Sequence, residues 1–152
     1  MRVRWTRYAI PGWGVGEVGV CDGRLVEHSL PRAGRDAGGD DPLAARFAAY
    51  FAGARDDFAD VELWPFERTP FEDDVLEAAR RIPYGETVSY GELAALAGHP
   101  GAQRAVGSFC GRNPFGLVVP CHRVVAADGP GSYGSYGIEY KLRLLRHEGV
   151  PV

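Results

Sequence analysis

The hydrophobic pattern of the chain changes near residue 67, and this change limits the folds that are open to it. Before that point, apolar residues alternate with polar ones or gather in short runs, which is typical of antiparallel strands. After it, apolar residues recur at helical spacing. A length of 152 residues allows one domain or two small lobes. The sequence therefore predicts an α+β fold with lobes at residues 1–66 and 67–152.

The first lobe is predicted to be a β-meander followed by a helix. The strands are expected at residues 3–10, 14–21 and 25–30, with Asp22-Gly23 as a turn between the last two. The Gly/Asp-rich residues 32–41 should form an exposed loop. A helix should follow from Leu43 and end before Gly53, and residues 61–66 are a candidate for a last strand.

The second lobe carries clear signals for the start of helices. Thr69 and Glu72 frame Pro70 in a capping box, so a helix should run over residues 70–81. Ser89 and Glu92 form a second capping box. The helix that it opens should end at Gly98, and a helix over residues 101–111 should follow a tight turn, which is the helix-turn-helix pattern.

The outer face of the helix over residues 101–111 is expected to carry small residues and one arginine. Its members are Gly101, Arg104, Gly107, Ser108 and Gly111. Each glycine costs about 1 kcal/mol relative to alanine inside a helix. Either close approach to DNA or tight packing between helices must compensate for that cost.

The two halves of the chain differ in charge. Residues 1–78 hold 9 basic and 15 acidic residues, whereas residues 79–152 hold 8 basic and 5 acidic ones. The second half is therefore the better candidate for binding nucleic acid. Of the 17 basic residues 16 are arginine, which suits phosphate and base edges but would also follow from a GC-rich genome.

The three cysteines Cys21, Cys110 and Cys121 include no CxxC pair, so neither a disulfide framework nor a zinc ribbon is expected. No apolar run approaches the roughly 18 residues that span a bilayer, and no apolar core follows the charged N-terminus. We expect a soluble, cytoplasmic protein that does not associate with membranes.

The segment Pro120-Cys121-His122-Arg123 holds the candidate chemistry. A cysteine after the apolar run 115–119, which predicts a buried strand, could be an inert buried thiol. Its neighbours favour a nucleophile, because positive side chains stabilise the thiolate and the proline bends the strand.

A histidine that acts as a base needs an acceptor to orient it, and Glu148 at the end of a predicted helix over residues 138–147 is the candidate. A solvated carboxylate at a helix terminus is the alternative. The glycine-rich residues 128–137 are expected to form a mobile loop over the site.

Residues 69–149 resemble the O6-alkylguanine-DNA alkyltransferases, DNA-repair proteins that act once. The shared segments are, in chain order, TPFEDDVLEA, IPYGETVSYGELAALAG, QRAVG, RNP, VPCHRVV, a Gly/Ser/Tyr loop and LLRHEG. The resemblance implies an N-terminal lobe with a ribonuclease-H-like sheet and a helical C-terminal lobe with a winged-helix-like helix-turn-helix. It implies double-stranded DNA containing O6-alkylguanine as the partner, with no cofactor. A monomer is our default expectation.

The resemblance also implies roles for individual residues. Cys121 would take the alkyl group, His122 would remove its proton through a water, and Glu148 would fix the imidazole. Tyr90 would turn the phosphate of the flipped nucleotide and support the departing oxygen. Asn113 would hold the turn before the cysteine strand.

Arg104 would enter the duplex from the minor groove and fill the space of the flipped guanine. Further DNA contacts are expected from Gly101, Ala105, Ser108, Tyr90, Arg112 and Arg123. The base pocket would be formed by the carbonyls of Cys121 and Val124, the backbone of Ser135, and the side chains of Tyr133 and Tyr136.

The chain departs from the family pattern in a few places. Glu72 and Leu76 stand where Gln and Trp are usual, and Gly134 stands where a tyrosine is usual. Some relatives hold a zinc ion in the N-terminal lobe, but Cys21 and His28 lack a second cysteine beside them, so no metal is expected.

Two other functions compete with alkyl transfer. A DNA-binding module without chemistry would have no need for Cys121, which the chain retains. A cysteine hydrolase would need an oxyanion hole, and nothing upstream of Cys121 indicates one.

Overall fold

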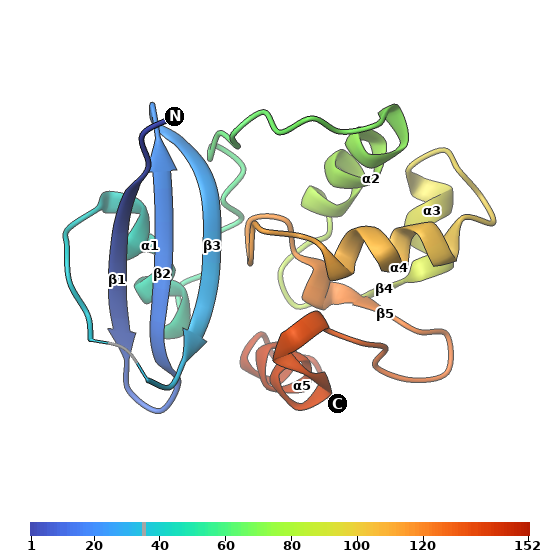
Figure 1. Cartoon of the computed structure of the whole chain (residues 1–152). Helices are drawn as coiled ribbons and strands as arrows, with labels where there is room; N and C mark the ends of the chain where they lie inside the picture. Colours follow the sequence, from blue (N-terminus) through green and yellow to red (C-terminus); the bar gives the residue numbers. More distant parts are fainter. Residues whose placement is uncertain (35) are drawn as a thin grey trace. The chain divides into compact units, whose positions relative to one another are not determined.

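The computed structural model describes residues 1–34 and 36–152, which form two compact units. Unit 1 comprises Met1–Pro65 and Pro114–Val118, and unit 2 comprises Phe66–Asn113 and Val119–Val152. The described residues have an α+β fold with one three-stranded antiparallel sheet and five α-helices (Figure 1). None of the helices in these residues is long and apolar enough to cross a membrane.

The sheet of unit 1 is the predicted meander. Its strands are β1 (Arg4–Ile10), β2 (Gly14–Cys21) and β3 (Arg24–Arg32), in that order. Asp22 and Gly23 have φ angles of 50° and 74°, as the two central residues of a type I′ hairpin turn require.

Two glycines of β2 make room for aromatic rings on β1. Gly16 pairs with Tyr8 and Gly19 pairs with Trp5. A Cβ atom would lie 2.4 Å from the Tyr8 ring at Gly16 and 2.6 Å from the Trp5 ring at Gly19. Each ring therefore covers its cross-strand partner, and a larger residue there would displace it.

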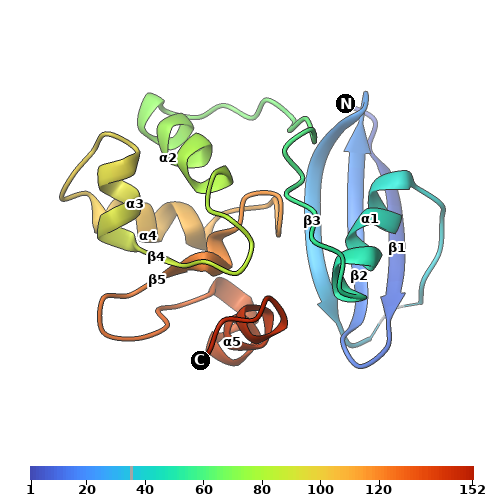
Figure 2. The same cartoon turned by 180° about the vertical axis from the view of Figure 1, so that it is seen from behind.

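Helix α1 (Pro42–Phe51) covers one face of this sheet (Figure 2). Its Phe47 ring stacks on His28 of β3, with ring centroids 3.6 Å apart. The Nε2 atom of His28 lies 2.5 Å from the Tyr8 hydroxyl, and Nδ1 lies 2.6 Å from the carbonyl oxygen of Gly116. Burial lowers the pKa of His28 to about 4, so the ring is neutral and both of its nitrogens are hydrogen-bonded.

Two of the predicted strands are wrong. Residues 61–66 make a single parallel bridge, at Leu63, in place of a strand. Residues 115–119 are buried as expected but make only one bridge, to His28. A φ of 69° at Leu117 interrupts the extended backbone that a strand needs.

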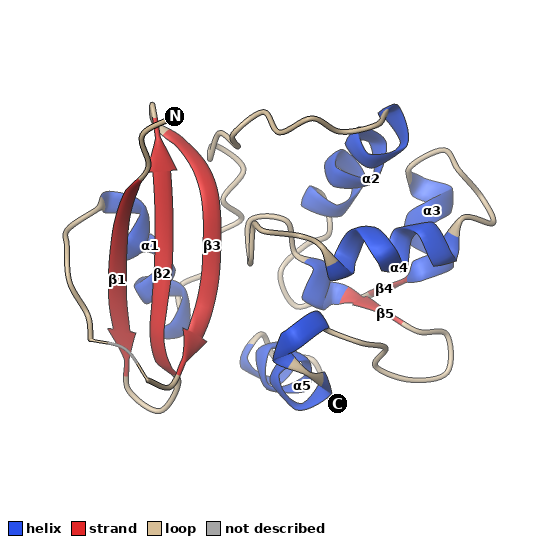
Figure 3. Ribbon diagram, in the orientation of Figure 1, coloured by secondary structure: helices blue, strands red, loops and turns tan. Residues whose placement is uncertain are grey.

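Unit 2 is mostly helical (Figure 3). Its α-helices are α2 (Pro70–Arg80), α3 (Tyr90–Leu96), α4 (Gln103–Gly111) and α5 (Ile138–His147). Both predicted capping boxes are confirmed, because Thr69 and Ser89 each exchange two hydrogen bonds with the residue three positions on. Each cap stabilises its helix by about 1 kcal/mol.

A short parallel pair of strands closes this unit. Strand β4 (Val88–Ser89), directly before α3, pairs with β5 (Val124–Val125). The 3-10 turn η1 (Cys121–Arg123) leads into β5, and a second 3-10 turn, η2 (Gly134–Tyr136), precedes α5. The pairing places the start of α3 beside the segment that follows Cys121.

Candidate active site

Cys121 begins a tight turn at the centre of unit 2. Its backbone N–H donates to Val119 at 2.8 Å, and the N–H of Arg123 donates to Pro120 at 2.9 Å, so the expected bend after Pro120 is a 3-10 turn. Cys121 is 3% exposed. In the described structure the sulfur is therefore shielded from solvent.

Asn113 connects α4 to this turn. Its Nδ2 donates to the carbonyl of Val119 at 2.8 Å, and its side chain is also hydrogen-bonded to Cys121. One amide thus holds both the backbone before the turn and the sulfur at its start.

His122 and Glu148 form a buried pair. The Nε2 of His122 lies 2.7 Å from an oxygen of Glu148, and both side chains are fully buried. An ionised carboxylate can only accept, so Nε2 carries the proton and Nδ1 is left as the basic nitrogen. Nδ1 has no hydrogen-bond partner among the described residues.

The charges of this pair are fixed by their surroundings. Burial would raise the pKa of Glu148, but hydrogen bonds and charge from His122 and Arg123 outweigh it and hold the pKa well below its usual range. Burial lowers the pKa of His122, although Glu148 opposes the change. At neutral pH the site therefore holds a carboxylate and a neutral imidazole.

Arg123 does not lie where a DNA contact requires it. Its side chain is 6% exposed, and Nε and Nη2 donate to the two oxygens of Glu148 at 2.8 and 3.0 Å. Nη1 donates to the carbonyl of Ile82 at 2.7 Å. The expectation that Arg123 binds DNA is wrong, because its fork holds the carboxylate that orients His122.

The protonation state of Cys121 also differs from the expectation. The sequence predicts that the positive charge of Arg123 stabilises the thiolate of Cys121. In the structure, however, Arg123 forms an ion pair with Glu148. The hydrogen bond to Cys110 and burial raise the pKa of Cys121 well above its usual value, while Asn113 and Lys141 lower it in part. The resting nucleophile is a thiol, so it needs a base.

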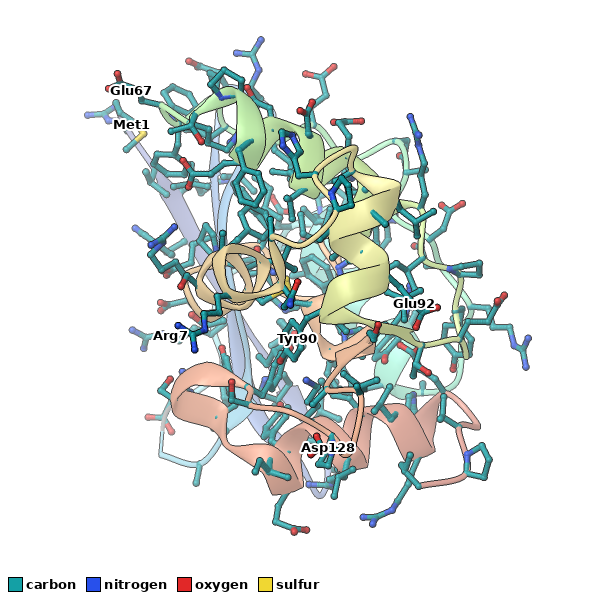
Figure 4. The ribbon with its side chains drawn as sticks, turned by 90° about the vertical axis from the view of Figure 1, so that its right-hand side faces the viewer. Met1, Arg7, Glu67, Tyr90, Glu92 and Asp128 are labelled. Atoms are coloured by element: carbon teal, nitrogen blue, oxygen red, sulfur yellow. The ribbon has the colours of Figure 1, made fainter. Side chains whose placement is uncertain are left out.

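Tyr90, labelled in Figure 4, projects from the first turn of α3 between α4 and α5. Its hydroxyl donates to the carbonyl of Ser132 at 3.4 Å, and Nζ of Lys141 on α5 donates to that hydroxyl at 3.4 Å. Gly131 lies so close that a Cβ there would be 2.7 Å from the hydroxyl. The expected loop over the site therefore packs against Tyr90.

Lys141 is a residue of the site that the sequence reasoning missed. It is fully buried, and Nζ donates to the carbonyls of Val124 and Ser132 at 2.5 and 3.0 Å. Burial lowers its pKa to about 8. It is the only lysine among 17 basic residues, and this was the signal available in the sequence. The Val124 carbonyl, expected to read the base, already accepts from Lys141.

The predicted outer face of the helix is exposed except at Gly107, which is half-buried, and its first member, Gly101, lies before the start of α4. The exposed members of the predicted DNA contacts are Gly101, Arg104, Ala105 and Ser108. Arg112, one residue beyond α4, is 67% exposed, with Nη2 lying 3.5 Å from Glu72. The described structure therefore leaves the Arg104 side chain open to solvent.

The tyrosines expected in the base pocket form a cluster. The rings of Tyr133 and Tyr136 lie 5.4 Å apart, and Tyr140 of α5 lies 5.1 Å from Tyr136. Ser135, between the first two, is exposed. Burial raises the pKa of Tyr133 well above its usual value, so its hydroxyl is protonated at neutral pH.

Comparisons with known proteins identify the class to which this arrangement belongs. Residues 70–150 match the family model described as 6-O-methylguanine DNA methyltransferase, DNA binding domain. A methylated-DNA–protein-cysteine methyltransferase of Methanosarcina acetivorans is 48% identical over 101 residues, and one of Salmonella typhimurium is 45% identical over 107. The matches cover 66% and 70% of this chain.

A solved structure covers nearly the whole chain. The Mycobacterium tuberculosis OGT in complex with DNA has a TM-score of 0.81 and 37% identity, over 95% of this chain and 92% of that one. The chain belongs to the 6-O-methylguanine DNA methyltransferase family. It spans 64% and 62% of the length of the Methanosarcina and Salmonella relatives.

Proposed function

We propose that the chain repairs O6-alkylguanine in double-stranded DNA by moving the alkyl group to the sulfur of Cys121, once per molecule. The observation that carries this proposal is that a buried thiol is followed in the sequence by a buried imidazole whose Nε2 is held by Glu148 and whose Nδ1 has no partner among the described residues. The names of the relatives support the same reaction.

The reaction begins with a proton transfer. Because the pKa of Cys121 is raised, the thiol must lose its proton as it attacks, and His122 Nδ1 accepts that proton through a water. Glu148 holds Nε2–H and balances the imidazolium that forms. The His122 imidazole therefore stays neutral until it accepts the proton of Cys121.

The sulfur then attacks the alkyl carbon, and the bond from that carbon to O6 breaks. The electron pair of the bond stays on guanine, and the Tyr90 hydroxyl donates to the departing oxygen. Its raised pKa keeps that hydroxyl protonated, so it is a donor at neutral pH. The product is a thioether, which has no easy leaving group, so no second turnover follows.

The outer face of α4 is the proposed DNA-binding surface. Gly101, Ala105 and Ser108 would lie against the backbone, and Arg104 would enter the minor groove in place of the flipped base. The exposed small residues and the net positive charge of residues 79–152 support the assignment of this face to DNA. Binding should weaken with salt.

Several finer assignments belong to the same proposal. Residues 67–152 would be the alkyltransferase domain with a winged-helix-like helix-turn-helix, and residues 1–66 a ribonuclease-H-like lobe. Asn113 would position the Cys121 turn, while Ser135, Tyr133 and Tyr136 would line the base pocket. A monomer without bound metal and a cytoplasmic location remain predictions.

One assay tests the function. The protein is mixed with duplex DNA containing O6-methylguanine, and its intact mass is recorded with time. We expect one methyl group per molecule, on the peptide that contains Cys121, in wild type and in the control Cys21→Ser but not in Cys121→Ser. DNA binding without a change in mass would instead indicate a module without chemistry. Continued turnover of an ester or amide would indicate a hydrolase.

A further inference from the structure

A backbone turn before β4 contacts the carboxylate of Glu148. The N–H of Glu86 donates to the carbonyl of Pro83 at 3.1 Å and closes this β-turn, whose third residue is Gly85. Gly85 has a φ of 79°, which is the positive value that the third residue of a type II turn requires. Its backbone N–H donates to Oε1 of Glu148 at 3.0 Å. The turn therefore adds a backbone donor to the buried carboxylate.

The carboxylate of Glu148 accepts hydrogen bonds on both of its oxygens. Oε1 accepts from Nε of Arg123 at 2.8 Å and from Gly85, while Oε2 accepts from Nη2 of Arg123 at 3.0 Å and from Nε2 of His122 at 2.7 Å. An ionised carboxylate has about four lone-pair sites for such bonds. A rotation of the carboxylate away from His122 would therefore also break the hydrogen bond from Gly85.

The absence of a side chain at position 85 allows this close approach. A Cβ atom there would lie 3.1 Å from the backbone carbonyl oxygen of Glu148, so a larger residue would displace that oxygen by a few tenths of an ångström. The positive φ of Gly85 is also a conformation that residues with a Cβ rarely adopt. The backbone conformation and the close approach to Glu148 thus both require glycine.

The same segment contacts the cation that pairs with Glu148. Nη1 of Arg123 donates to the carbonyl of Ile82 at 2.7 Å, and its guanidinium carbon lies 5.7 Å from the centroid of the Tyr84 ring. The Tyr84 hydroxyl donates to the carbonyl of His147 at 3.5 Å. Residues 82–85 therefore contact both members of the buried ion pair.

We propose that Gly85 is a positioning residue for alkyl transfer, because it fixes the Glu148 carboxylate in the orientation that holds His122. This role rests on the proposed function, in which Nδ1 of His122 accepts the proton of Cys121. If Glu148 moves, the Nε2–H of His122 loses its acceptor, and Nδ1 is no longer fixed as the basic nitrogen. Gly85 thus acts on the reaction through Glu148.

The test compares the full chain with Gly85→Ala and with the matched control Gly23→Ala. Gly23 has a φ of 74°, but among the described residues no atom beyond its chain neighbours lies within 4 Å of a Cβ there. Both variants therefore carry the strain of a side chain at positive φ, and only Gly85→Ala displaces Glu148. Thermal unfolding shows whether each variant is folded.

Two measurements report on the site. Single-turnover transfer from free O6-benzylguanine is recorded over a range of substrate concentrations, which separates the maximal rate from substrate binding without DNA. NMR of protein with isotope-labelled histidine follows the Nε2–H proton of His122, which is assigned by its loss in His122→Gln. The second measurement does not depend on alkyl transfer.

In Gly85→Ala we expect the maximal rate to fall about tenfold with the half-saturating concentration unchanged, because the base is misplaced while the substrate still binds. The His122 proton signal should move upfield as its hydrogen bond to Glu148 weakens. Gly23→Ala should keep the wild-type rate and the wild-type signal. The proposal is overturned if either the rate or the signal of Gly85→Ala equals that of Gly23→Ala.

Two further outcomes are distinguished by the same design. If Gly85→Ala does not fold, Gly85→Asn replaces it with Gly23→Asn as control, because asparagine accepts a positive φ more readily and still places a Cβ near Glu148. Absence of transfer by wild type would contradict the proposed function. The His122 signal alone would then decide whether Gly85 positions Glu148.

Discussion

Replacing Glu148 by glutamine keeps the shape of the side chain and removes its charge, which makes it the sharpest test of the site. The carboxylate accepts from His122 at 2.7 Å, from Arg123 at 2.8 and 3.0 Å, and from the backbone N–H of Gly85 at 3.0 Å. Glutamine can satisfy only part of this set, because one of its two polar atoms is a donor. The guanidinium of Arg123 is then buried without a counter-charge.

The cost can be estimated from these contacts. Removing one partner of a buried ion pair costs about 3–5 kcal/mol. The amide oxygen keeps some hydrogen bonds, so we expect the lower end, about 3 kcal/mol. In a domain of this size each kcal/mol lowers Tm by about 2–4 °C, so Glu148→Gln should unfold about 6–12 °C below wild type. Methyl transfer should slow by about 100-fold or more, because His122 loses the group that orients it.

The assay pairs thermal unfolding with the rate of methyl transfer, and Glu139→Gln is the control. Glu139 is exposed in the first turn of α5, the helix that ends just before Glu148, so its loss should cost less than about 1 kcal/mol. Adding Arg123→Met to Glu148→Gln removes the stranded charge and should restore part of the Tm but none of the rate. If Glu148→Gln matches Glu139→Gln in both measurements, the pair neither orients His122 nor stabilises the unit.

Three further predictions follow from other parts of the chain. Arg104→Ala should slow repair of duplex DNA by about tenfold or more yet react normally with free O6-benzylguanine, with Gln103→Ala as control; equal loss on both substrates would exclude a flipping role. His28 has a pKa of about 4 in the folded chain and about 6.5 when unfolded, so its contribution to stability is present above pH 6.5 and is lost as pH falls toward 4. The Tm of His28→Gln should vary less with pH over that interval, and an unchanged slope would contradict this assignment. Thr69→Ala should lower stability by about 1 kcal/mol through loss of the α2 cap, seen in urea unfolding, while the transfer rate stays the same; a loss of transfer in folded protein would show that α2 does more than support the site.

The features that the sequence predicted well depend on neighbours along the chain. The capping boxes at Thr69 and Ser89 act over three residues, so the starts of α2 and α3 follow from local composition. The I′ turn at Asp22-Gly23 likewise needs only two residues that accept a positive φ. Cys121, His122 and Glu148 are predicted because they lie in the segments VPCHRVV and LLRHEG that the chain shares with the family.

The features that the sequence did not predict depend on partners far along the chain. Residues 61–66 have the composition of a strand, but a strand needs an edge with which to pair, and the structure offers only the bridge at Leu63. The sequence indicates that Arg123 is a surface cation. The fold instead brings it into contact with Glu148, which lies 25 positions later in the chain.

The sequence by itself predicted the four helices of unit 2 and the starts of α2, α3 and α5, whereas α4 begins two residues later than predicted. It also predicted which sulfur, imidazole and carboxylate we propose for the reaction. Only the tertiary structure decided the state of those groups. Burial and contact set whether the sulfur is a thiol, whether the imidazole is neutral, and whether Lys141 shares the site. These properties arise from loss of water and from charges a few ångströms away, and distance in space cannot be read from distance along the chain.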